Sequence, residues 1–116
     1  MKRGDVVIAD FPFFDQPGSK RRPALVVQAD VYNAKMVTTV LAMISGNIKH
    51  ASDPAQCLVD PGTSDSASSG LRGPSVVKCT NLVTVYQANV IYTIGQLSPR
   101  LMQRVDACLK QALGIP

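Results

Sequence analysis

The sequence has few of the residues from which many catalytic sites are built. Tryptophan is absent, aromatic residues make up 5% of the 116 positions, and the single histidine, His50, lies in a polar stretch. A lone histidine excludes mechanisms that use two histidines, and no serine–histidine–aspartate grouping can be assembled around it. We expect His50 to be a solvated loop residue. The scarcity of aromatic side chains also argues against a wide platform for stacking nucleic-acid bases.

Metal-binding patterns are missing as well. Cys57, Cys79 and Cys108 are odd in number, lie far apart in the sequence and form no Cys-x-x-Cys pair. Because a structural zinc site needs about four clustered ligands, we expect no metal and no other cofactor. The three cysteines are instead expected to be small buried residues in a reducing compartment.

Long apolar segments are absent too. No hydrophobic run approaches the ~18 residues of a membrane span, and the charged N-terminal residues do not resemble a signal peptide. We therefore expect a soluble, cytoplasmic protein. No paired-carboxylate motif, phosphate-binding P-loop or GxGxxG motif occurs either.

The composition is that expected of one globular domain spanning residues 1–116. Hydrophobic residues make up 46% of the chain and charged residues 17%, so the chain is able to bury a core without disulfides. The formal net charge of +4 favours a polyanionic partner, although it carries no information about the fold.

The hydrophobic pattern predicts six strands followed by one helix. Apolar and β-branched runs bounded by turn residues predict strands at Asp5–Phe11, Pro23–Gln28, Met36–Ser45, Gln56–Asp60, Ser75–Thr80 and Val90–Leu97. Pro23 is expected only at the first position of its strand, because it has no N–H for the ladder. Residues Phe11–Arg22 and Pro61–Pro74 contain several turn-forming residues and are predicted to be loops.

The C-terminal helix has the clearest signals. Ser98 is a suitable N-cap, Pro99 suits the first helical position, and Gly114 is placed to end the helix. An apolar stripe at helical spacing is expected to pack against the sheet; it comprises Leu101, Met102, Val105, Cys108, Leu109, Ala112 and Leu113. The order of elements predicts a mainly β protein with a C-terminal helix, in which the helix packs against a small, strongly bent sheet or barrel.

Positive charge is concentrated just before the second predicted strand, in the stretch GSKRRPALVV (Gly18–Val27). A solvated turn is the simplest explanation of such a run. Arg22, however, directly precedes Pro23, and a residue before proline is held in extended geometry. Arg22 therefore has less backbone freedom than Lys20, and a guanidinium fixed at the start of a strand suits bidentate recognition of a phosphate.

Four stretches, in order and spanning essentially the whole chain, resemble the MazF/PemK toxins of bacterial type II toxin–antitoxin systems. They are KRGDVVIADF (Lys2–Phe11), RRPALVVQ (Arg21–Gln28), TTVLAMISGNI (Thr38–Ile48) and IGQLSPRLMQRVDACLKQALGI (Ile94–Ile115). The opening Arg-Gly-Asp-Val, the Arg-Pro before a hydrophobic strand and the closing Ala-Leu-Gly-Ile are fairly specific when they occur together.

The resemblance implies a CcdB/MazF-like fold, a compact SH3-like barrel that forms a homodimer. It implies a metal-independent endoribonuclease, an mRNA interferase, that cuts single-stranded RNA at short sequences. It also implies a cognate antitoxin, whose inhibitory part we expect to be an extended acidic segment. The catalytic arginine of the family's Arg-Pro motif falls on Arg22, and its hydroxyl residue at the end of the third strand falls on Ser45. Further candidates for binding RNA are Lys20, Arg21, Asn47 and Asn81.

The sequence departs from the family pattern in two places. Lys20 stands where many members carry an acidic residue, and Val83 stands where an arginine often follows the fifth strand. The general acid and base are therefore left unassigned. Two other functions stay open: a gyrase poison related to the CcdB toxins, which needs no Arg-Pro motif, and a barrel that binds nucleic acid without cutting it.

Overall fold

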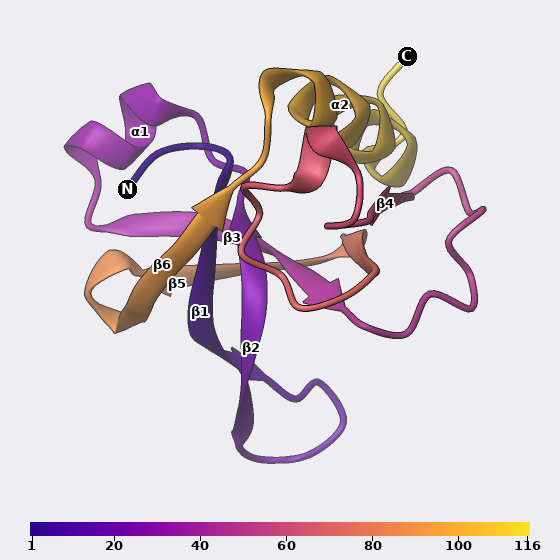
Figure 1. Cartoon of the computed structure of the whole chain (residues 1–116). Coiled ribbons are helices and arrows are strands. Elements are labelled where there is room, and N and C mark those ends of the chain that lie inside the picture. The colour runs from indigo at the N-terminus through magenta and orange to yellow at the C-terminus, as the bar shows by residue number, and fades with distance from the viewer.

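The computed structural model describes all residues from 1 to 116 and places six strands in one antiparallel sheet (Figure 1). The strands are β1 (Asp5–Pro12), β2 (Ser19–Val26), β3 (Thr38–Ser45), β4 (Gln56–Val59), β5 (Ser75–Tyr86) and β6 (Val90–Gln96). Their order is β4-β5-β3-β2-β1-β6, so the sheet is open, with β4 and β6 at its edges. The remaining elements are helices α1 (Asp30–Lys35) and α2 (Pro99–Leu113) and the 3-10 turns η1 (Ser64–Ser66) and η2 (Gln87–Asn89).

The alternation of side chains along the strands divides the buried residues into two cores, one on each face of the sheet. The first core lies between the sheet and α2 and comprises Val6, Leu25, Ala42, Ile44, Cys57, Val59, Val77, Cys79, Leu97, Leu101 and Val105. The second core comprises Val7, Ala9, Phe11, Ala24, Val26 and Leu41. No helical residue packs against the second core; Val83 and Val85 of β5 and Val90 of β6 do. The sheet therefore bends around this core, as the sequence predicts.

Helix α2 has the predicted boundaries. The Ser98 hydroxyl accepts the Leu101 N–H at 3.2 Å, and Gly114 adopts a left-handed φ of 68°. Leu101 and Val105, on the face of α2 that packs against the first core, are fully buried, whereas Leu113, expected in the same stripe, is exposed in the last helical turn. Neither helix of this structure is long and apolar enough to cross a membrane.

Strand β2 begins earlier than predicted. Residues Ser19–Arg22, expected in a loop, pair with β1 in a hairpin, and Pro23 lies inside the strand opposite Ile8. The prediction that Pro23 begins its strand is therefore wrong. The ladder between β2 and β3 starts only at Ala24. The outer half of β2 thus has an unpaired side, where the missing N–H of Pro23 costs no hydrogen bond.

Strand β5 has 12 residues and continues to Tyr86, well beyond the predicted end at Thr80. Its register against β3 shifts, because Ala42 faces Leu82 whereas the next residue, Met43, faces Lys78. Residues 79–81 consequently have no partner on β3 and form a bulge, which bends a strand and redirects its side chains. The bulge accommodates Asn81, a residue type disfavoured in regular strands.

Helix α1 is absent from the sequence-based prediction. Its N-cap residue, Ala29, makes no side-chain hydrogen bond to the helix. The buried Asn33 fixes the segment instead: its amide donates to the Gln28 carbonyl at 3.0 Å, and its oxygen accepts the Thr39 hydroxyl at 2.7 Å. Tertiary hydrogen bonds therefore hold a turn that is too short to be stable by itself. The third strand begins after this turn, at Thr38, and not at Met36.

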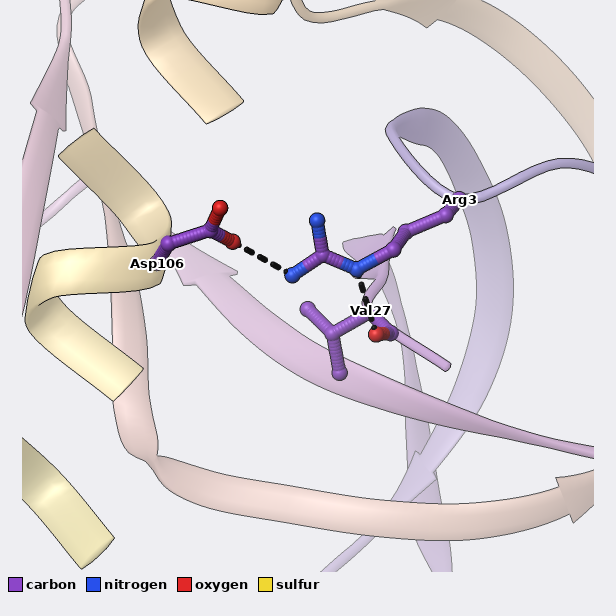
Figure 2. Close-up of polar contacts among 3 residues, drawn as sticks. All are labelled: Arg3, Val27 and Asp106. Atoms are coloured by element: carbon purple, nitrogen blue, oxygen red, sulfur yellow. Dashed lines mark hydrogen bonds and ion pairs between the residues drawn. The ribbon is translucent and has the colours of Figure 1, made fainter. Parts of the chain in front are cut away.

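Arg3 connects the N-terminal segment to β2 and α2 (Figure 2). Its Nε donates to the carbonyl of Val27, just beyond β2, at 2.8 Å, and its Nη2 lies 2.6 Å from Oδ1 of Asp106 on α2. The backbone N–H of Arg3 donates to Asp30 at 2.6 Å, a hydrogen bond that lowers the pKa of the Asp30 carboxyl. One side chain thus joins three segments that are distant in the sequence.

None of the three cysteines forms a disulfide. Cys57 and Cys79 are buried in the first core, as predicted, and Cys108 is half-buried and packs against that core. Burial raises the pKa of Cys57 to about 11 and that of Cys79 to about 12. Both thiols are therefore protonated at neutral pH. His50 is exposed in a turn, also as predicted.

Candidate active site

The second core opens at one end into a cavity of about 540 Å³. Its lining comes from β1 and the loop after it, from β2 and β3, and from β5 at the bulge. The lining residues are Phe11, Pro12, Phe13, Phe14, Asp15, Arg22, Met43, Lys78, Thr80, Asn81, Leu82 and Val83. The volume falls within the range of typical ligand sites.

Arg22 is the predicted cation that reaches this cavity. It lies on β2 opposite Ala9, on the same face as Ala24 of the second core, and is half-buried. The three ion pairs of the structure involve other arginines, namely Arg3, Arg21 and Arg100. Arg22 therefore presents a guanidinium to the cavity without a carboxylate partner.

Arg21 and Lys20 are placed differently from Arg22. Arg21 lies opposite Asp10 on β1, and its Nε is 3.9 Å from the Asp10 carboxylate. Because successive side chains of a strand point to opposite faces, Arg21 lies on the face away from the cavity. Lys20 shares the face of Arg22 but is exposed in the outer hairpin and does not line the cavity. The structure thus separates the three cations that the sequence places together.

Ser45 is the last residue of β3 and is half-buried. The β2–β3 ladder ends at the pair Ala24 and Met43. Continued by two residues along each strand, the same register would place Arg22 opposite Ser45. The Ser45 hydroxyl accepts the Asn47 N–H at 3.1 Å. Ser45 is therefore at the same end of the sheet as Arg22, beside the lining of the cavity but not part of it.

The two predicted asparagines differ in position. Asn47 is exposed in the turn after β3, where its side-chain oxygen accepts the Lys49 N–H at 3.1 Å. Asn81 lines the cavity, because the bulge in β5 brings Thr80 and Asn81 to its wall. The Thr80 hydroxyl donates to the Asn81 side-chain oxygen at 3.4 Å, which leaves the Asn81 amide N–H groups available to a ligand.

Sequence reasoning missed the aromatic character of the site. The chain has three phenylalanines, and all of them line the cavity: Phe11, Phe13 and Phe14. Phe14 is 95% exposed, so its ring is open to contact with a ligand. The low aromatic content excludes a wide stacking platform but not this local one. The signal was visible in the sequence as FPFF, a few residues before the cationic stretch.

Sequence reasoning also missed Lys78, a second cation of the cavity. Lys78 comes from β5, on the wall across β3 from Arg22. Asp15 is the single carboxylate in the lining, so cationic side chains outnumber anionic ones. Cations, hydroxyl and amide donors and aromatic faces together suit a phosphodiester with a base beside it.

The chain matches the family model described as "PemK-like, MazF-like toxin of type II toxin-antitoxin system" over residues 2–113. It is 34% identical over 118 residues to endoribonuclease MazF6 of Mycobacterium tuberculosis H37Rv, an alignment that covers 99% of this chain and 98% of the relative. It is 28% identical over 116 residues to endoribonuclease EndoA of Bacillus subtilis 168, with 99% and 96% covered.

Solved structures of similar fold include toxins bound to antitoxins. An endoribonuclease in complex with its cognate antitoxin, from a mycobacterial species, superposes with a TM-score of 0.79 at 22% identity and covers 100% of this chain and 97% of its own. MazF in a MazE–MazF complex from Deinococcus radiodurans has a TM-score of 0.74 at 19% identity, with 100% and 98% covered. These likenesses confirm the expected fold class.

Proposed function

The chain belongs to the PemK-like, MazF-like toxin family of type II toxin–antitoxin systems, and we propose how it acts as the endoribonuclease of such a system. It cleaves single-stranded RNA, including mRNA, through attack of a ribose 2′-hydroxyl on the neighbouring phosphate. Residues 1–116 form one toxin domain, and the cavity at the open end of the second core receives the scissile phosphate. The observation that carries this proposal is Arg22, a half-buried guanidinium that lines the cavity without a carboxylate partner.

Arg22 stabilises the charge that develops during the reaction. A bond forms between the 2′-oxygen and phosphorus while the bond from phosphorus to the 5′-oxygen breaks. The 2′-hydroxyl gives up its proton, and the leaving 5′-oxygen gains one. Negative charge builds on the non-bridging phosphate oxygens, where a fixed, planar guanidinium donates two hydrogen bonds. The products are a 2′,3′-cyclic phosphate and a 5′-hydroxyl.

Ser45 acts as a hydrogen-bond donor to the same phosphate. Its oxygen already accepts the Asn47 N–H, so its own O–H is left to donate to a ligand. With Arg22 at the same end of the sheet, the two side chains contact the phosphate from neighbouring strands. Ser45 has no base beside it that would make it a covalent nucleophile.

The phenylalanines explain why the substrate is single-stranded. Bases that are free of a duplex stack on the accessible rings of Phe13 or Phe14, while Phe11 is buried in the second core, and Asn81 donates its amide N–H groups to a base edge. The requirement for a 2′-hydroxyl as nucleophile makes the enzyme act on RNA and not on DNA. A gyrase poison would need none of these features.

The protein acts in the cytoplasm as a homodimer, in which a twofold axis repeats the cavity on each protomer. Its antitoxin inserts an extended acidic segment that places carboxylates where RNA phosphates would lie. The structure of a related endoribonuclease in complex with its cognate antitoxin supports an antitoxin as the partner.

The test compares RNA cleavage by the wild type and by Arg22→Ala, with Arg21→Ala as the matched control. Both substitutions remove one arginine from β2, but Arg21 lies on the opposite face beside Asp10. Arg22→Ala should lower the cleavage rate roughly a hundred- to a thousandfold, the usual effect of losing a donor to a developing oxyanion. Arg22→Lys should also be poor, because an ammonium lacks the planar fork.

Arg21→Ala should stay within a few-fold of the wild type. Near-normal cleavage by Arg22→Ala would refute the catalytic assignment. Intact RNA after incubation with the wild-type protein would refute the enzyme itself and favour either a gyrase poison or a binding protein.

A further inference from the structure

Lys78 is a half-buried lysine near the start of β5 that lines the same cavity as Arg22. Resting on the function proposed above, we propose that Lys78 binds the RNA phosphate next to the scissile one. It thereby sets the affinity for the substrate and contributes little to the chemical step.

Lys78 has no anionic partner in the protein. None of the three ion pairs includes it, and the cavity's single carboxylate, on Asp15, is not within ion-pair distance. An ammonium group has three donors and no acceptor, so a partly buried lysine without an anion is costly to hold. An anion that enters the cavity removes this cost, and the phosphodiester is the anion of the substrate.

Gln56 of β4 lies directly opposite Lys78, and its side-chain oxygen is buried without a hydrogen-bond partner. Side chains directly opposite each other on antiparallel strands have Cβ atoms about 5 Å apart. The Gln56 oxygen is therefore an acceptor within reach of Lys78. If one N–H of the Lys78 ammonium donates to the Gln56 oxygen, the other two N–H groups are left to donate to a phosphate.

The sheet register separates Lys78 from the scissile phosphate. Lys78 faces Met43, whereas Ser45 faces Val76, two residues farther along. Lys78 on β5 is two strands away from Arg22 on β2, with β3 between them, and is displaced from it by two residues along the strand direction. On a flat sheet these two displacements put the Cα atoms of Arg22 and Lys78 about 12 Å apart. A phosphate held by Arg22 near Ser45 therefore leaves Lys78 facing the next phosphate of the strand.

The residue type agrees with this role. Lysine is a flexible point charge that binds phosphate without the directional fork of arginine. A flexible point charge suits a phosphate that keeps its charge throughout the reaction. The directional stabilisation of the transition state is left to Arg22.

The experiment compares the wild type with Lys78→Met, which keeps the length and apolar stem of the side chain. KM and kcat are measured on a short fluorogenic RNA, and Kd is measured on the same RNA with a 2′-deoxy sugar at the cut site. Lys78→Met should raise KM and Kd about tenfold at low salt, the typical effect of one charge-assisted contact, with kcat within twofold. Loss of one phosphate contact should also make the plot of log affinity against log salt less steep by about 0.7.

Two further variants are measured alongside. Lys78→Arg should restore most of the affinity because it restores the charge. Lys110→Met, which removes an exposed lysine from α2, should change neither KM nor the salt dependence.

Unchanged KM and salt dependence in Lys78→Met would overturn the proposal. An equal fall in kcat would overturn it as well, because that result would place Lys78 on the scissile phosphate. Both outcomes require a wild type that cleaves RNA. A wild type that cuts no RNA would refute the proposed function instead, so the two failures are distinguishable.

Discussion

Replacement of Arg3 by methionine should destabilise the protein without changing its activity. The substitution keeps much of the apolar stem but removes the donor to the Val27 carbonyl, at 2.8 Å, and the ion pair with Asp106, at 2.6 Å (Figure 2). The hydrogen bond from a charged donor to a part-buried carbonyl is worth about 1.5 kcal/mol. The side chains of Arg3 and Asp106 are 28% and 47% exposed, so solvent screening limits the ion pair to about 0.5 kcal/mol.

The sum, about 2 kcal/mol, converts into a shift of the melting temperature. An unfolding entropy of about 2.1 cal/mol/K per residue gives about 0.24 kcal/mol/K for this chain, so Tm should fall by about 8 °C. Thermal unfolding followed by circular dichroism at one fixed protein concentration measures the shift. Asp106→Asn removes only the charge of the ion pair and should lower Tm by about 2 °C.

The result that would refute this reasoning is a Tm for Arg3→Met within 2 °C of the wild type. Equal losses in Arg3→Met and Asp106→Asn would show that the ion pair, and not the bond to Val27, dominates. RNA cleavage at 25 °C serves as the internal control, because Arg3 does not line the cavity and kcat should be unchanged.

Three further outcomes are expected. RNA cleavage should continue in excess EDTA, since no three His, Cys, Asp or Glu side chains are grouped to hold a metal ion. The downstream product should carry a 5′-hydroxyl, and a 5′-phosphate there would contradict attack by the 2′-hydroxyl. Ser45→Ala should lower kcat about tenfold, less than Arg22→Ala, because a neutral hydrogen bond is lost and not a charge, and Ser45→Thr should retain part of the rate; an unchanged rate would place the hydroxyl role elsewhere. Burial raises the pKa of Cys57 from 9.0 to about 11, so the folded protein keeps a proton that the unfolded chain loses, and the free energy of unfolding should fall between about pH 9 and pH 11. Urea unfolding of Cys57→Ala should show a shallower fall over this range, and an identical fall would exclude the thiol as its cause.

The elements that the sequence predicts well are those with local signals. Helix α2 carries its own cap, first-turn proline and terminal glycine, and its boundaries agree with the structure. Strand β2 and strand β5 extend beyond their predicted limits, because a partner strand decides where pairing begins and ends. Pro23 is tolerated inside β2 only because β3 has not yet joined at that point, and no local pattern reveals this.

The site follows the same division. The position of Arg22 at the cavity is predictable because its signals are local in the sequence, namely the following proline and the apolar strand that begins there. Lys78 is not, since the face it occupies depends on the register of β5 against β3 and on the shift between Ala42 and Met43. Arg21 shows that proximity in the sequence does not place residues on one face, because strand alternation directs it to Asp10, away from the cavity. Its expected contact with RNA stays a prediction.

The motifs that carry the family resemblance divide between architecture and chemistry. In the opening Arg-Gly-Asp, Arg3 joins β2 to α2, and Asp5 accepts the Lys2 N–H at 2.9 Å. Gly4 adopts a φ of 96°, a backbone conformation that residues with a side chain rarely adopt, so the position requires glycine for its backbone and not for a ligand. None of these residues lines the cavity, whereas Arg22 does. A related chain that keeps the opening motif but lacks the Arg-Pro arginine should therefore fold in the same way and cut RNA at least a hundredfold more slowly, as expected for Arg22→Ala.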